Sequence, residues 1–244
     1  MSALVRTELL KLLWTRGTWG FLTAALLLVL GRVVLALGGV GRVGGPAPGS
    51  AELTLAVLGC SGLGIFVIVL LGVVSVTREF HSGTWTSTLL TTPDRRRLVV
   101  AKVLASSTVG AGMSALLLVL AAVVGLASGV VVFHVDAPLV RFVVGAVISG
   151  ACWAWIGVGV GVLVRNQTVA LLLPVAWLLV VETLLVSYGL RELLPWTPGG
   201  ATRTVSGEPL PGALPVWAAV SLLVGYAATL TVSGARRLVR ADVS

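Results

Sequence analysis

The stretch 77–102, TREFHSGTWTSTLLTTPDRRRLVVAK, is the long polar interruption around which the rest of the chain is arranged. Hydrophobic runs long enough to cross a bilayer lie on both sides of it. Ser82-Gly83-Thr84 is typical of a helix start, whereas Thr92-Pro93 is typical of a helix end because a residue before proline disfavours the helical region. The pattern therefore predicts a short helix at about 85–90, lying at the membrane surface between two spanning helices.

Composition indicates a membrane protein. The chain has 244 residues, of which 57% are hydrophobic and only 11% are charged, and its mean hydropathy is +1.06. Soluble domains carry roughly 25% charged residues. The net charge of +8 does not indicate nucleic-acid binding, because the cations lie at the ends of apolar runs and form no basic stripe with aromatic residues. We therefore expect the lipid bilayer, and no nucleic acid, among the partners.

The order of apolar runs predicts an all-α membrane protein of one domain, 1–244. An amphipathic helix at the N-terminus would place Val5, Leu9, Leu12 and Leu13 on one face, along the membrane surface. Six spanning helices follow at about 19–38, 53–76, 98–126, 142–164, 168–188 and 214–233. The broken segment 189–212, with its prolines and Trp196, predicts short external helices before the last span.

Six spans place both termini on the same side of the membrane, and the basic residues decide which side. With the termini, the stretch 77–102 and the turn at Arg165 in the cytoplasm, most of the 17 basic residues are cytoplasmic. The external side then holds only Arg42, Arg141, Arg191 and Arg203, and Arg32 lies inside a span. The sequence therefore predicts a multi-pass protein of the cell membrane with both termini cytoplasmic.

The stretch 77–102 resembles the region between the second and third spans of ABC-2-type transporter permeases. Those membrane subunits pair with a separate ATP-binding cassette protein, and their pattern has a glutamate, Gly-Thr, a short helix, a proline, arginine and a lysine entering the third span. The residues that match this pattern are Glu79, Gly83, Thr84, Trp85 and Leu89 of the short helix, Pro93, Arg95, Arg96, Arg97 and Lys102. The resemblance extends to the plan of the whole chain.

The resemblance implies a membrane permease subunit of an ATP-driven exporter. The short helix would be a coupling helix that docks on the ATPase subunit, and a second permease subunit, identical or related, would complete a dimer. It also implies that this chain is not itself an enzyme: ATP and Mg would bind to the ATPase, with no cofactor or metal on this chain. The sequence itself is consistent with this expectation. A phosphate-binding loop needs Gly-Lys followed by Ser or Thr, whereas Lys11 and Lys102 are followed by Leu12 and Val103.

Two ionisable residues inside predicted spans form a second group of interest. Arg32 and Glu182 both lie roughly 22–24 Å from the cytoplasmic end of their helices at 1.5 Å per residue. Opposite charges at one depth predict an intramembrane pair or two linings of one pathway. Pro174, in the same span as Glu182, is expected to bend that helix. Mostly apolar spans fit a hydrophobic or amphipathic cargo such as a drug, a peptide or a lipid-like molecule.

Two other interpretations stay open at this point. Gly59-Cys60-Ser61-Gly62 is similar to the GxSG motif of rhomboid proteases, which would make the chain an intramembrane serine hydrolase. That chemistry needs a base near Ser61, and the histidines, His81 and His134, fall in polar connections far from it in sequence. A non-transport membrane scaffold that recruits a cytoplasmic partner is the other alternative.

Overall fold

A computed structural model describes residues 1–42, 45–81, 95–208 and 210–240, and this part of the chain contains helices and no strand. The helices are α1 (Ser2–Trp14), α2 (Arg16–Leu37), α3 (Ala51–Gly59), η1 (Cys60–Leu63), α4 (Gly64–His81), α6 (Arg95–Ala127), α7 (Ala137–Val164), α8 (Gln167–Ala176), η2 (Trp177–Val181), α9 (Glu182–Ser187), η3 (Arg191–Trp196), α10 (Pro198–Ser206) and α11 (Val216–Arg240).

Six helical segments in the described residues are long and apolar enough to cross a membrane. They are α2, α3 with η1 and α4, α6, α7, α8 with η2 and α9, and α11. The all-α, six-span fold predicted from the sequence is therefore confirmed. The short 3-10 turn η1 in the second span and the π-helical turn η2 in the fifth are local irregularities that hydropathy does not predict.

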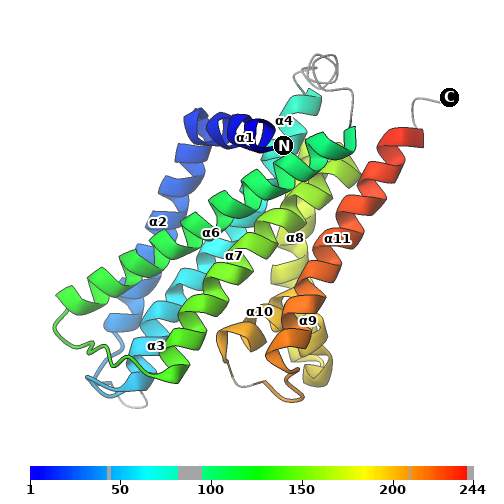
Figure 1. The fold of residues 1–244 in the computed structure, drawn as a ribbon. Helices are drawn as coiled ribbons and strands as arrows, with labels where there is room; N and C mark the ends of the chain where they lie inside the picture. The colour runs from blue at the N-terminus through cyan, green and yellow to red at the C-terminus, as the bar shows by residue number, and fades with distance from the viewer. Residues whose placement is uncertain (43–44, 82–94, 209, 241–244) are drawn as a thin grey trace.

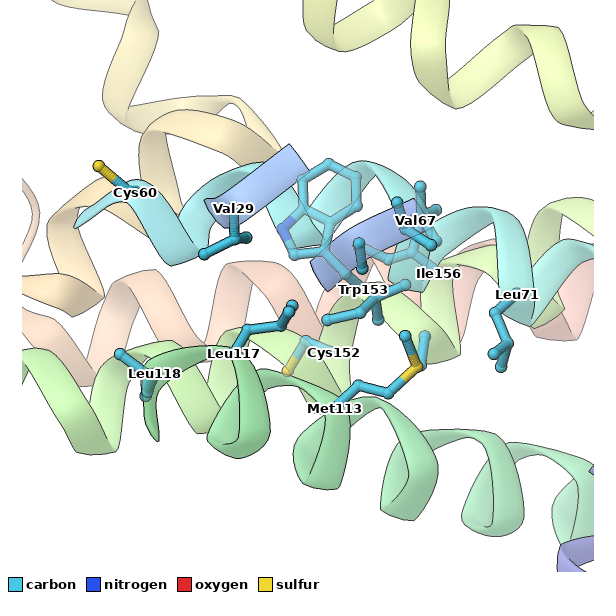
Figure 2. Close-up of a cluster of buried hydrophobic side chains, with 14 of the residues drawn as sticks. Val29, Cys60, Val67, Leu71, Met113, Leu117, Leu118, Cys152, Trp153 and Ile156 are labelled. Atoms are coloured by element: carbon cyan, nitrogen blue, oxygen red, sulfur yellow. The ribbon is translucent and has the colours of Figure 1, made fainter. Parts of the chain in front are cut away.

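Helix α7 is the centre of the bundle and packs against α4, α6 and α11 (Figure 1). The largest buried side chain is Trp153 of α7, which is 2% exposed and lies among apolar side chains of α2, α4 and α6 (Figure 2). Its indole Nε1 donates to Thr202 Oγ1 of α10 at 2.8 Å. Because the one polar atom of Trp153 has a partner, the indole stabilises the core without an unsatisfied group.

Glycines allow α7 and α4 to approach closely. A Cβ atom on Gly157 would clash with the carbonyl oxygen of Val69, and one on Gly161 would lie 3.0 Å from the carbonyl oxygen of Val73. The four-residue spacing places both glycines on the face of α7 that meets α4. Gly125 and Gly129 have the same spacing, but a Cβ atom on Gly125 would lie 3.1 Å from Val57, whereas Gly129 lies in the turn after α6 with φ +72° and has no atom within 4 Å of its Cβ position.

Replacing Gly157 with alanine is expected to destabilise the bundle by about 1–2 kcal/mol, because the new methyl group forces α7 away from α4. Thermal unfolding of the purified protein in detergent measures this loss. The control is Gly112→Ala in α6, where a Cβ atom meets nothing within 4 Å. Equal melting temperatures for the two variants would contradict the close packing of α7 on α4.

The two ends of the bundle differ. Helix α1 lies across one end, whereas α10 lies at the opposite end, beside α7 and α11 (Figure 1). Helix α10 is buried almost throughout, and the Arg141 guanidinium donates to the carbonyl oxygen of Thr204 at 2.7 Å. The predicted broken segment before the last span therefore forms two short helices, η3 and α10, that fold back onto the bundle.

Candidate functional site

A cluster of four charged side chains joins three helices at the α1 end of the bundle. Glu8 and Lys11 come from α1, Glu79 from the last turns of α4, and Lys102 from the second turn of α6. The Lys102 ammonium, 2% exposed, donates to Glu8 Oε2 and to Glu79 Oε1, both at 2.7 Å. Lys102 therefore connects α1 to the two helices that flank residues 82–94.

Lys11 completes the cluster from the more exposed side. Its Nζ atom donates to Glu8 Oε1 at 2.7 Å and lies 3.6 Å from Glu79 Oε1. The two negative charges of the carboxylates are thus matched by the two positive charges of the ammonium groups, and a buried cluster needs such matching because an unpaired buried charge is costly. The second oxygen of Glu79, Oε2, is buried and has no hydrogen-bond partner among the described residues.

The orientation of α1 follows from this cluster and corrects one sequence prediction. Val5, Leu9 and Leu12 are partly buried, as the amphipathic pattern predicts, but Leu13 is 49% exposed. The most buried side chain of the helix is instead Glu8, at 4% exposed. Helix α1 therefore turns a carboxylate toward the bundle, because Lys102 lies there and an unpaired buried ammonium would be costly.

Ion pairing shifts two pKa values in the cluster, in opposite directions. Burial acts to raise the pKa of Glu8, but the charges and hydrogen bonds of Lys102 and Lys11 outweigh it and hold the pKa below its ordinary value of 4.5. Burial likewise acts to lower the pKa of Lys11, but Glu8 and Glu79 outweigh it and raise that pKa above 10.5. Both shifts favour the charged forms and therefore stabilise the docked α1.

The two shifts predict the pH range in which α1 stays docked. Glu8 contributes its full stabilisation above pH 4.5 and loses it as pH falls through its lowered pKa; Lys11 contributes fully below 10.5 and loses it as pH rises through its raised pKa. Spin labels at Leu10 and Val100, both exposed, are expected to keep a constant separation between these limits and to move apart in acid. In Glu8→Gln the acid transition should disappear, and an unchanged transition would contradict the role of Glu8.

Most of the predicted coupling residues lie in or beside the part that the structure leaves undescribed. Gly83, Thr84, Trp85, Leu89, Pro93 and the predicted helix at 85–90 all fall outside the described residues. Arg95 and Arg96 belong to the first turn of α6, followed by Arg97. Glu79 and Lys102, from opposite sides of residues 82–94, are brought into direct contact. Glu8 and Lys11 were not singled out from the sequence as site residues. A signal was present, because Glu8 lies on the inner side of an amphipathic helix and Lys11 follows it three residues later.

A cavity of about 440 Å³ lies toward the α10 end, and both intramembrane charges line it. Arg32 enters from α2 and Glu182 from α9, while Trp153, Phe142 and Ser114 form other parts of its wall. No ion pair between Arg32 and Glu182 forms. Both side chains therefore line one cavity, and their place on a transport pathway stays a prediction.

The carboxylate of Glu182 is held by the start of α10. Glu182 Oε1 accepts a hydrogen bond of 2.8 Å from the Gly199 amide, and the side chains of Thr197 and Trp177 also lie against this carboxylate. Amides at a helix N-terminus are free to bind an anion and carry partial positive charge. A Cβ atom at position 199 would clash with the carboxylate, so glycine is needed there.

Pro174 explains how Glu182 reaches this position. It lies inside α8, where it lacks the N–H that would continue the helical hydrogen bonds, and the π-helical turn η2 begins three residues later. Glu182 is the first residue after that turn. The wider turn rotates the following residues relative to a regular helix and places Glu182 toward α10.

The serine of the GxSG sequence has no histidine beside it. Ser61 is buried in η1 and lines the cavity, but none of the described residues that line that cavity is a histidine. His134 instead lines a separate, smaller cavity near the start of α7, together with Asp136. Among the described side chains, Ser61 therefore lacks the histidine partner that the serine hydrolase interpretation requires.

The fold and these two sites define a polytopic α-helical membrane protein with a charged cluster at one end and a polar cavity at the other. The family model described as "ABC-2 family transporter protein" matches residues 4–185, well over half of the chain, and the chain belongs to this family. The matched part includes the charged cluster, Arg32 and Glu182 and ends before α10. No curated protein matches the chain significantly.

Proposed function

We propose that this chain is the permease subunit of an ATP-driven exporter, which transfers motion from a separate ATPase subunit to its membrane helices. The ATPase docks at residues 82–94 on the cytoplasmic side, where both termini also lie. Membership in the ABC-2 family supports the permease role. ATP and Mg act on the ATPase subunit, since the chain carries no phosphate-binding loop of its own.

The observation that carries the proposal is the buried Lys102 between Glu8 and Glu79. A force on residues 82–94 acts on α4 and α6 at the two ends of that segment. Because Lys102 binds α1 as well, the three helices move as one unit and the movement reaches the bundle core through α4 and α7. In this proposal Glu79 and Lys102 hold the docking segment in place and do not contact the ATPase.

The exposed apolar faces fit the proposed setting. Leu27, Leu28 and Leu35 of α2 and Leu172 and Leu179 of α8 and η2 are exposed on the single chain. Lipid and a second permease subunit, identical or related, cover such faces without cost. The cargo is a hydrophobic or amphipathic molecule that enters between these helices.

The test is to tag the chain in its native host, extract it gently and identify an ATP-binding cassette protein that co-purifies. Trp85→Ala is expected to abolish the recovery of this partner, because Trp85 lies in the proposed docking segment. Trp217→Ala is the matched control, since Trp217 is 73% exposed in α11, away from that segment. Absence of an ATPase partner from folded wild-type protein would overturn the proposal.

A further inference from the structure

The cavity of about 440 Å³ has both charged and apolar lining residues. Its polar lining includes Arg32, Arg203, Glu182, Glu208 and Ser61. The other walls are apolar and include Ile65, Phe66, Phe142 and Leu178. A cavity of this size that combines charged and apolar side chains fits part of a small amphipathic molecule.

Three of the four charges already have partners. Glu182 accepts from the Gly199 amide at the start of α10, and Arg203 Nε lies 4.0 Å from Glu208 Oε2. Arg32 forms neither an ion pair nor a hydrogen bond with any residue in the described part of the chain. An arginine at this depth of a spanning helix is costly unless an anion or water meets it.

We propose that this cavity binds the anionic head group of an amphipathic molecule, with Arg32 as its main ligand and Arg203 as the second. Guanidinium groups bind carboxylate and phosphate oxygens through paired N–H donors. The alkyl part of the molecule then lies against Phe66 and Phe142. The idea that such a molecule is the exported cargo rests on the proposed permease function, whereas its binding to the cavity does not.

The alternative partner for Arg32 is Glu182, and the geometry disfavours it. The Glu182 carboxylate already receives the Gly199 N–H and lies against Thr197 and Trp177. Moving it toward Arg32 would leave the buried Gly199 amide without an acceptor, which costs about 1–3 kcal/mol. Arg32 thus stays available for an anion from outside the chain.

The binding experiment uses the permease alone, in nanodiscs of neutral phosphatidylcholine. The probe is dodecyl phosphate with a diazirine on its alkyl chain, and mass spectrometry locates the crosslinks. We expect crosslinks in the segments that carry Phe66 and Phe142, with competition by unlabelled dodecyl phosphate and none by dodecyltrimethylammonium, which has the same chain length. Arg32→Gln is expected to weaken binding at least about tenfold, the equivalent of one charge-assisted hydrogen bond.

Arg42→Gln is the matched control, because Arg42 is exposed in the connection after α2 and does not line the cavity. Arg32→Lys, which keeps the charge without the paired donors, should give intermediate affinity and guards against simple misfolding of Arg32→Gln. Equal binding in wild type and a monodisperse Arg32→Gln variant, or equal competition by the cationic amphiphile, would overturn the proposal.

Two further measurements identify the source of the anion. Displacement of the probe by added phosphatidylglycerol would assign the cavity to a membrane lipid. Stimulation of ATP hydrolysis by dodecyl phosphate in the assembled complex, lost in Arg32→Gln, would assign it to the cargo. Failure to recover an ATPase leaves the binding result unchanged, so the two proposals fail separately.

Discussion

Replacing Lys102 with methionine is expected to cost about 3–5 kcal/mol of stability, the range measured when one partner of a buried ion pair is removed. The ammonium is 2% exposed and lies 2.7 Å from an oxygen of both Glu8 of α1 and Glu79 of α4. Methionine fills nearly the same volume, so the loss reports the charge and not a cavity. Thermal unfolding in detergent measures the effect on stability, and recovery of the proposed ATPase partner measures the effect on assembly.

Lys11→Met is the matched control for this substitution. Lys11 contacts the same two carboxylates, but its side chain is 45% exposed, and an exposed pair contributes only about 0–1 kcal/mol. Adding Glu8→Gln and Glu79→Gln to Lys102→Met removes the unpaired charges and should recover part of the lost stability. Equal losses in Lys11→Met and Lys102→Met would show that Lys102 does not have the central role assigned to it.

The fold of this chain could be predicted from the sequence because a bilayer restricts the structures that can span it. Apolar runs of about 20 residues have few alternatives to spanning helices, and prolines and glycines mark the connections. The irregular turns η1 and η2 could not be predicted in this way. The π-helical turn at Trp177–Val181 depends on Pro174 together with the packing of Glu182 against α10, and hydropathy contains no information on either.

Two of the four residues in the charged cluster could be predicted from the sequence. Glu79 and Lys102 were singled out through a family pattern, but the pattern does not state that they touch each other. The contact of Lys102 with Glu8 joins residues 94 positions apart, and no local periodicity predicts such a pairing. The same holds for Arg32 and Glu182, whose shared depth indicated proximity, whereas only the position of α10 decides that the carboxylate binds Gly199.

Replacing Glu182 with alanine is expected to cost about 3 kcal/mol, since it removes a charge-assisted hydrogen bond and leaves the buried Gly199 amide without an acceptor. The loss should be local, because the carboxylate holds the start of α10. Hydrogen exchange is expected to accelerate in Pro198–Ser206 while the centre of α7 stays protected. Glu192→Ala is the control, because Glu192 is exposed in the preceding short helix η3.

Glu182→Gln separates the two interpretations of this residue. The glutamine amide oxygen still accepts from Gly199, so a residue that holds α10 should retain about half of the lost stability in this variant. A partner of Arg32 would instead depend on the charge, and Arg32→Gln combined with Glu182→Gln would then give a smaller loss than the sum of the single losses. We expect the two losses of stability to add within about 0.5 kcal/mol, as they do for two sites that do not interact. The reason is that the Glu182 carboxylate binds the start of α10 and forms no ion pair with Arg32. A larger coupling energy would instead place the two side chains in one ion pair and remove the free guanidinium on which anion binding in the cavity depends.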